Sequence, residues 1–253
     1  MIAGRLELTD AQLDSALGRT SPVVKLAIAI AWLGGLAFTL QPAPPLALAA
    51  AALLAGVGLG GIPARTFART LAPLWVAAAT VGLSNMVFSA SNGDPAAAEF
   101  LAFGGIRITA EGAMNGLGLA LRVAAIACVG AVFTLTTDST RLADALVHQA
   151  RIPARFAYGA LAAYQLIPQF SEDLSTLRQA RRIRGLRGSW HPRLLLGLLV
   201  LAIRHGDRMA LSMDARAFGS GPRTSYREVR WSALDVVVAI GSAVALAGAL
   251  ALA

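Results

Sequence analysis

From Ala113 to Thr136 the sequence reads AMNGLGLALRVAAIACVGAVFTLT, an apolar run interrupted by one charge, Arg122. As a helix this run is long enough to cross the hydrocarbon core of a bilayer, which is about 30 Å thick. An arginine at that depth must pair, face the bundle interior or extend toward the interface, so a functional role for Arg122 stays open beside a structural one. The stretch predicts a membrane-spanning helix.

Four other apolar stretches have the same character, and the composition of the whole chain agrees with them. They run from Val23 to Leu40, Leu46 to Gly61, Pro73 to Ser89 and Leu234 to Leu252. Of the 253 residues 56% are hydrophobic and 14% are charged, whereas about 25% are charged in soluble proteins. We predict an all-α polytopic membrane bundle of five spans, or of six if an apolar run beginning at residue 156 or 194 also crosses.

The distribution of basic residues predicts the orientation of the bundle. Fifteen of the 22 lysines and arginines lie in residues 137–233, which the positive-inside rule places in the cytoplasm. The same rule predicts a cytoplasmic loop at residues 62–71, which carry Arg65 and Arg69, and places the less basic residues 91–112 outside. The expected parts are membrane helices in residues 1–136, a cytoplasmic helical region in residues 137–233 and a last membrane helix in residues 234–253.

The cytoplasmic region contains amphipathic helices. Asp138 is a candidate helix N-cap, and Pro153 ends the helix that follows. Further on, apolar side chains recur at the spacing of one helix face, and continuing this spacing reaches Arg181. The stripe consists of Leu166, Phe170, Leu174 and Leu177. A second apolar run, from Leu194 to Ile203, leads into Arg216. We predict a pair of amphipathic helical arms that each end in arginine.

Two arginine-bearing segments form the ends of these arms. They are Arg178-Gln179-Ala180-Arg181-Arg182-Ile183-Arg184-Gly185 and Ser212-Met213-Asp214-Ala215-Arg216-Ala217-Phe218-Gly219. We expect each helix to stop at its glycine, because glycine adopts the left-handed conformation common at helix C-termini. The helix dipole accounts for one or two basic residues there. It does not account for five arginines within ten positions: Arg178, Arg181, Arg182, Arg184 and Arg187.

The paired segments resemble the two Ala-Arg-Gly motifs in the transmembrane T component of energy-coupling factor transporters, the vitamin and transition-metal importers of the ABC class. The tripeptides here are Ile183-Arg184-Gly185 and Ala215-Arg216-Ala217, so each departs from Ala-Arg-Gly at one flanking position. Weaker matches lie elsewhere in the chain, at Ser21-Pro22-Val23-Val24-Lys25-Leu26, Thr136-Thr137-Asp138 and Leu166-Ile167-Pro168.

The resemblance implies a non-enzymatic subunit of a prokaryotic plasma-membrane importer, without a cofactor of its own. It implies docking on two ABC ATPase subunits and contact with a substrate-binding S component. The implied ATPase-docking residues are Arg184 and Arg216, with Arg181, Arg182, Ala215 and Gly185. Three alternatives stay open from the residues themselves: a basic surface for anionic lipid headgroups, a stand-alone secondary transporter, and a membrane-embedded enzyme.

Several kinds of site are disfavoured by what the sequence lacks. Lys25 is the only lysine and no phosphate-binding loop precedes it, so no ATP site of that kind is encoded. The single cysteine, Cys128, allows neither an internal disulfide nor a cysteine-rich metal site. No histidine stands at a metal-ligand spacing. The adjacent acids Glu172 and Asp173 point in different directions on a helix, and we expect them on its solvated face. The scarcity of aromatic residues argues against nucleic-acid binding.

Overall fold

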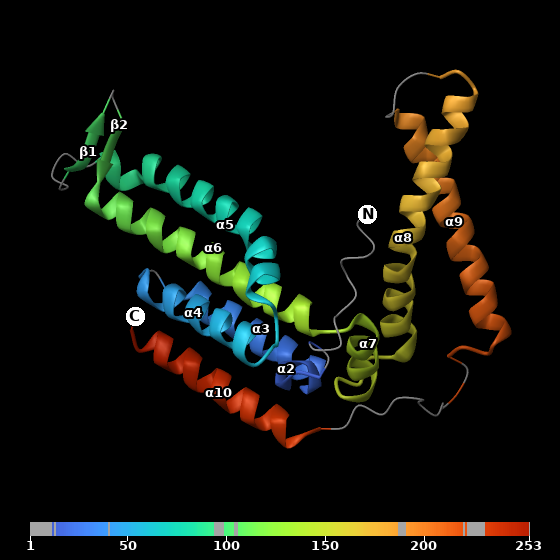
Figure 1. Ribbon diagram of the computed structural model, residues 1–253, viewed down its shortest axis with the longest axis horizontal. Coiled ribbons are helices and arrows are strands. Elements are labelled where there is room, and N and C mark those ends of the chain that lie inside the picture. Colours follow the sequence, from blue (N-terminus) through green and yellow to red (C-terminus); the bar gives the residue numbers. More distant parts are fainter. Residues whose placement is uncertain are drawn as a thin grey trace. The chain divides into compact units, whose positions relative to one another are not determined.

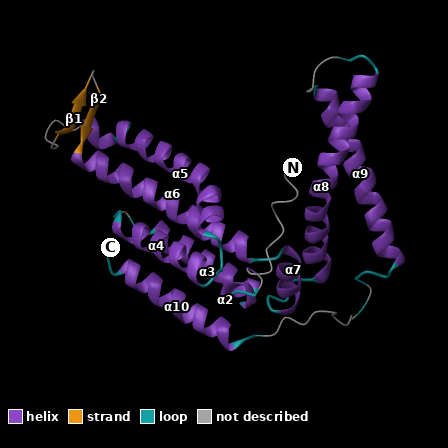
Figure 2. Cartoon of the chain, in the orientation of Figure 1, coloured by secondary structure: helices purple, strands orange, loops and turns teal. Residues whose placement is uncertain are grey.

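The computed structural model describes residues 12, 14–39, 41–93, 99–103, 106–186, 191–219, 221 and 231–252. The chain divides into two compact units. The membrane unit comprises Glu7–Leu142 and Arg230–Ala253, and the hairpin unit comprises Met1–Leu6 and Ala143–Val229. Figure 2 shows helices throughout the described chain, with one small pair of strands in the membrane unit.

The membrane unit contains a helix wherever the sequence predicts a span. Its helices and strands are α2 (Ala16–Arg19), α3 (Pro22–Ala37), α4 (Ala43–Gly58), α5 (Ala64–Val87), the 3-10 helix η2 (Ala90–Gly93), β1 (Glu99–Phe103), β2 (Ile106–Thr109), α6 (Ala110–Thr136) and α10 (Ala233–Leu250). The segment from Ala64 to Gly93, α6 and α10 are long and apolar enough to cross a membrane, and α3 and α4 are shorter apolar helices. The prediction of an all-α membrane bundle is confirmed.

The prediction that residues 62–71 form a loop is wrong, because α5 already begins at Ala64. Phe67 and Leu71 are almost fully buried, and their packing holds the first turns of α5 against the bundle. Pro73 lies inside the helix rather than at its start. Membrane helices tolerate proline because neighbouring groups can satisfy the freed backbone carbonyl, and α5 bends along its length (Figure 1), as helices do at proline.

A short antiparallel hairpin, β1 with β2, joins α5 to α6 and was not predicted from the sequence. Asn92 connects the two ends of this segment. Its side-chain amide donates to the carbonyls of Met86 and Val87 at 2.9 and 3.0 Å, and its Oδ1 accepts from the backbone and hydroxyl of Thr109 at 2.9 and 3.0 Å. Thr109 in turn caps α6. One side chain therefore fixes both the end of α5 and the beginning of α6.

Helices α5 and α6 approach closely because small residues face each other. A Cβ built on Gly82 would lie 2.5 Å from the Cβ of Ala120 and 2.9 Å from the carbonyl oxygen of Gly116. A Cβ on Gly116 would lie 2.7 Å from the carbonyl oxygen of Gly82 and 2.8 Å from the Cβ of Met86. Such contacts are the usual means of packing helices in lipid, where apolar burial drives no association.

A buried polar cluster holds together the end of the bundle where α3 and α10 begin and α6 ends. The Lys25 ammonium donates to the carbonyl oxygen of Thr136 at 2.6 Å. Asp235 accepts from the backbone of Ser21 at 2.6 Å and from that of Ser232 at 2.8 Å, the second bond belonging to a capping box at the start of α10. Two segments of the family resemblance, those containing Lys25 and Thr136, thus meet in space.

The hairpin unit is built on two long helices, α8 (Ala154–Ile183) and α9 (Pro192–Ala215). The preceding helix α7 (Ser139–His148) reaches across the division between the units, and Asp138 caps it as predicted, its carboxylate accepting from the backbone of Arg141 at 3.0 Å. Helices α8 and α9 run antiparallel and cross (Figure 1). The predicted stripe on α8 is confirmed, because all four of its residues and Arg181 are half-buried.

Candidate functional site

The first arginine segment ends α8 in a left-handed turn, and Arg184 is the C-cap residue that follows the last helical residue, Ile183. Arg184 has φ −77° and ψ 8°, and Gly185 follows it at φ 72°. The backbone of Gly185 donates to the carbonyl of Arg182 at 3.1 Å, and that of Leu186 donates to the carbonyl of Arg181 at 3.1 Å. These two bonds are the Schellman pattern, which satisfies the last helical carbonyls.

The second segment ends α9 in the same kind of turn, but the left-handed residue is an alanine and not the expected glycine. Arg216 is the capping residue, with φ −94° and ψ 12°, and the left-handed residue after it is Ala217 at φ 53°. Ala217 donates to the carbonyl of Asp214 at 2.9 Å, and Phe218 donates to that of Met213 at 3.0 Å. The prediction that Gly219 stops this helix is therefore wrong, because the hydrogen-bonding pattern closes two residues earlier.

The two ends lie at opposite extremes of the helix pair. Because α9 runs back along α8, Arg184 lies near the beginning of α9 and Arg216 at its end. Helix α9 has 24 residues, which makes it about 36 Å long. The second end also packs against the base of α8, where the ring of Phe218 meets that of Tyr158 edge-on with centroids 6.4 Å apart. The structure thus presents two equivalent arginine caps, widely separated on one scaffold.

Tyr158 ties this second end to α7 as well. Its hydroxyl donates to the buried carboxylate of Asp144 at 2.8 Å. Burial and this hydrogen bond to Asp144 both raise the pKa of Tyr158, so the phenol keeps its proton and remains a donor at neutral pH. Phe218, the residue that closes the α9 cap, therefore rests on a side chain that is itself held in place.

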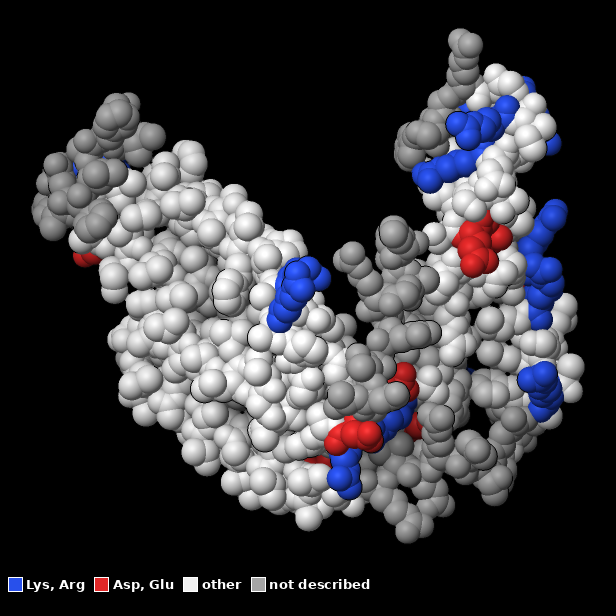
Figure 3. Space-filling view, in the orientation of Figure 1, with Lys and Arg blue, Asp and Glu red and all other residues white. Residues whose placement is uncertain are grey.

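Most of the sequence-predicted site residues are exposed. Arg182, Arg184, Gly185, Ala215 and Arg216 face solvent, whereas Arg181 is half-buried and lies on the stripe that faces α9. Within the part of the chain that the structure describes, Arg178, Arg181, Arg182 and Arg184 have no carboxylate partner. Figure 3 shows Lys and Arg gathered over the end of α8 and along α9. The fifth arginine of the cluster, Arg187, lies outside the described residues.

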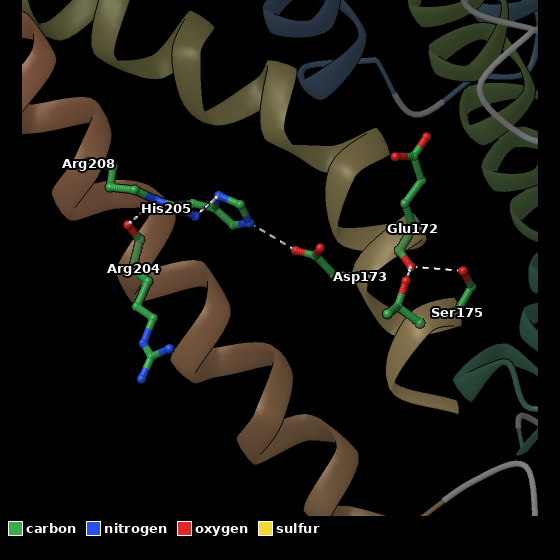
Figure 4. A network of polar contacts seen from close by, with 7 residues as sticks. Glu172, Asp173, Ser175, Arg204, His205 and Arg208 are labelled. Carbon is green, nitrogen blue, oxygen red and sulfur yellow. Dashed lines mark hydrogen bonds and ion pairs between the residues drawn. The ribbon is translucent and has the colours of Figure 1, made fainter. Parts of the chain in front are cut away.

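A polar contact that the sequence did not predict connects the two helices. The carboxylate of Asp173 lies 3.0 Å from Nε2 of His205, and Nδ1 of the same ring lies 3.0 Å from the guanidinium of Arg208 (Figure 4). Since arginine is always a donor, Nδ1 accepts and Nε2–H donates to Asp173. Glu172 is exposed as expected, but the prediction of a solvated Asp173 is wrong. The sequence feature that could have predicted this contact is an acid on α8, Asp173, and a histidine on α9, His205, each next to the apolar face of its helix.

The sequence profile of the cobalt transport protein family CbiQ matches residues 14–226 of the chain. The protein belongs to this family. Known relatives agree with the match: the energy-coupling factor transporter transmembrane protein EcfT of Limosilactobacillus fermentum is 29% identical over 242 residues, which cover 88% of each chain. The EcfT of Lactococcus lactis subsp. cremoris is 26% identical over 255 residues, covering 90% of each chain.

A third relative of this CbiQ-family protein has a different name. The putative ABC transporter ATP-binding protein of Bifidobacterium longum is 26% identical over 255 residues, which are 94% of this chain but 32% of that protein. The chain is thus the transmembrane component of an energy-coupling factor transporter of the ABC class, a multi-pass protein of the cell membrane. A stand-alone secondary transporter is not favoured.

The other residues of this CbiQ-family member that could react or bind a ligand lie in places where they pack within the fold. Cys128 is fully buried in the core of the membrane unit. Across the described ranges no three histidines, cysteines or acids come together as metal ligands. The Nε atom of Arg122 is buried and has no hydrogen-bond partner among the described residues. Neither group forms part of the arginine-capped ends.

Proposed function

We propose that this protein couples ATP hydrolysis by two ABC ATPase subunits to the movement of a substrate-binding S component, and that Arg184 and Arg216 are its ATPase-docking residues. The observation that carries the proposal is the pair of matching Schellman ends, each with arginine as its C-cap residue. Two copies of one local geometry at opposite ends of a helix pair suit a partner that also comes in two copies.

The chemistry of the ends supports docking into a groove. A guanidinium makes two parallel bonds to a carboxylate, and such charge-assisted bonds are strongest where water is excluded. Arg184 is exposed and has no acid beside it in the described chain, so its bonding capacity is available to a partner. Arg182 and Gly185 lie beside Arg184, and Ala215 lies beside Arg216, so each belongs to the surface of its own helix end. Half-buried Arg181 supports the first end from the side facing α9.

The relative from Bifidobacterium longum supports an ATPase as the partner. That protein is named for ATP binding, and about a third of its length is similar to nearly all of this chain. We therefore infer that ATPases are the partners of this chain, and we expect the chain by itself neither to bind nor to hydrolyse ATP.

We propose that the S component contacts a second surface of the hairpin unit. On α9 a row of large apolar side chains is more than half exposed: Leu195, Leu196, Leu199 and Ile203. This row faces away from the stripe that packs on α8. An apolar partner surface is the chemistry that fits it. Substrate recognition, of a vitamin or a transition-metal ion, belongs to that partner.

The test compares arginine removal with lysine replacement in the transporter co-expressed with its ATPase subunits and S component. Arg184→Ala and Arg216→Ala should each weaken co-purification of the ATPases, because truncating one member of a desolvated pair costs roughly 2 to 5 kcal/mol. The double variant should abolish uptake. Lysine should rescue poorly, since a point charge does not reproduce the guanidinium fork.

Arg178→Ala is the matched control, because Arg178 is exposed on the same helix but does not cap it. It should leave assembly and uptake unchanged. A surface for anionic lipid headgroups gives a different pattern, with each arginine worth about 1 kcal/mol and lysine substituting well. Equal, small losses at all three positions with full rescue by lysine would exclude the docking proposal.

A further inference from the structure

The membrane unit contains an apolar cavity of about 460 Å³ between α10 and the helices α3, α4 and α6. This volume lies in the range of ligand-binding pockets, roughly 300 to 1,000 Å³. Two polar side chains reach its wall, and both are engaged: Lys25 donates to Thr136, and Ser242 accepts from the indole nitrogen of Trp32 at 3.0 Å. An apolar space without available polar partners does not hold ordered water. The occupant is therefore apolar.

The depth of the cavity matches one leaflet of a bilayer. Along α10 its wall extends from Leu234, next to the helix start, to Ala245. Eleven residues of helix rise about 16 Å, and half of the hydrocarbon core is about 15 Å. Trp32 and Ser242 lie toward the deep end, where their hydrogen bond joins α3 to α10. The cavity is a slot that begins at the surface end of the bundle and stops near mid-membrane.

The slot is open to the surrounding lipid. Val237 lines it and is nevertheless 65% exposed. Gly241 also lines it, and a Cβ built there meets no atom within 4 Å. A gap of this kind between α10 and its neighbours forfeits dispersion contacts unless something fills it.

We propose that this slot binds one acyl chain of a membrane phospholipid, inserted from the leaflet at which α3 and α10 begin. The chain lies along α10 with its methyl end beside Trp32. In this position it supplies the contacts that α10 lacks on this side and makes the seating of the last membrane helix dependent on lipid.

The test measures quenching of Trp32 fluorescence by phospholipids that carry bromine near the methyl end of one chain. The full-length protein is reconstituted into phosphatidylcholine vesicles as a variant in which Trp32 is the only tryptophan; the substitutions are Trp75→Phe, Trp190→Phe and Trp231→Phe. Trp32 is only 6% exposed to solvent, yet it should lose as much fluorescence as exposed Trp75 does in the reciprocal variant. Bromine near the headgroup should quench Trp32 less.

Two leucine substitutions on α10 complete the test. Gly241→Leu fills the slot and should abolish quenching of Trp32, whereas Gly248→Leu, on the same helix with open space around its Cβ but outside the slot, should leave it unchanged. Undiminished quenching of Trp75 in the Gly241→Leu protein shows that the bundle remains folded; if that protein does not fold, Gly241→Val is read by the same criterion. Absence of Trp32 quenching while Trp75 is quenched, or quenching insensitive to Gly241→Leu, would overturn the proposal.

Discussion

The matching helix ends predict that replacing glycine by alanine at the first end destabilises it, and that replacing alanine by glycine at the second end stabilises it. Gly185 and Ala217 occupy the same left-handed position, at φ 72° and φ 53°. Gly185→Ala should therefore destabilise the end of α8, and Ala217→Gly should stabilise the end of α9. The two changes add or remove the same methyl group.

The expected magnitude comes from backbone conformation alone. A Cβ built on Gly185 meets no atom within 4 Å, so packing does not contribute. A left-handed conformation costs a residue with a side chain roughly 1 to 2 kcal/mol. A difference of that size changes the population of an open state about five- to thirty-fold. The same range applies with opposite sign to Ala217→Gly.

Native-state hydrogen exchange measures these local openings. The amides to follow are those that close each cap: residues 185 and 186 at the first end, and 217 and 218 at the second. Gly206→Ala is the control, because Gly206 lies inside α9 with open space around its Cβ. There alanine should slow exchange, since it favours a helix interior over glycine by about 0.5 to 1 kcal/mol.

Exchange that is unchanged in Gly185→Ala would refute this account of the first cap. Faster exchange in Ala217→Gly would refute the account of the second. If both substitutions behave as expected, the assembly of the transporter should follow the same order, with weaker ATPase retention in Gly185→Ala.

Packing, pairing and capping elsewhere give three more expected outcomes. Gly116→Ala forces a methyl group against α5 and should cost about 1 to 3 kcal/mol, whereas Gly130→Ala, with open space on the same helix, should not lower the melting temperature; equal losses would contradict the close packing. Single and double substitutions Asp173→Asn and His205→Gln should show a coupling of about 0.5 to 3 kcal/mol, and strictly additive effects would mean no contact. Asn92→Ala should destabilise by about 1 to 3 kcal/mol through unmet backbone groups, and a melting curve like that of the wild type would rule out its bridging role.

The membrane fold could be predicted because an apolar segment in lipid must satisfy its own backbone hydrogen bonds, which a helix does. Length and hydropathy locate each span without knowledge of its neighbours. The stripe on α8 was predictable for a similar reason, since the spacing of its leucines identifies the face that packs on α9. The start of α5 was not, because the burial of Phe67 and Leu71 is a tertiary fact and Pro73 alone favours a later start.

The details of the candidate site required coordinates. The glycine rule places the end of α8 correctly at Gly185, but at the second end the left-handed residue is an alanine, which no propensity favours. The contact of Asp173 with His205 depends on how α8 crosses α9, and spacing within one helix does not determine that. The hydrogen bonds of Asn92 likewise join segments separated by a hairpin whose strands carry no strong sequence signal.

The two long helices are braced at points far apart along α8. Leu177 meets Gly197 near one end, where the leucine lies 3.3 Å from a Cβ built on the glycine, and Tyr158 meets Phe218 near the other. The 19 residues between Tyr158 and Leu177 amount to about 28 Å of helix. A helix pair that is in contact near both ends resists scissoring, so we expect α8 and α9 to move together unless the aromatic contact breaks. A displacement imposed on Arg184 is therefore transmitted along both helices toward Arg216, and under the proposed docking the direction in which one ATPase moves constrains the other.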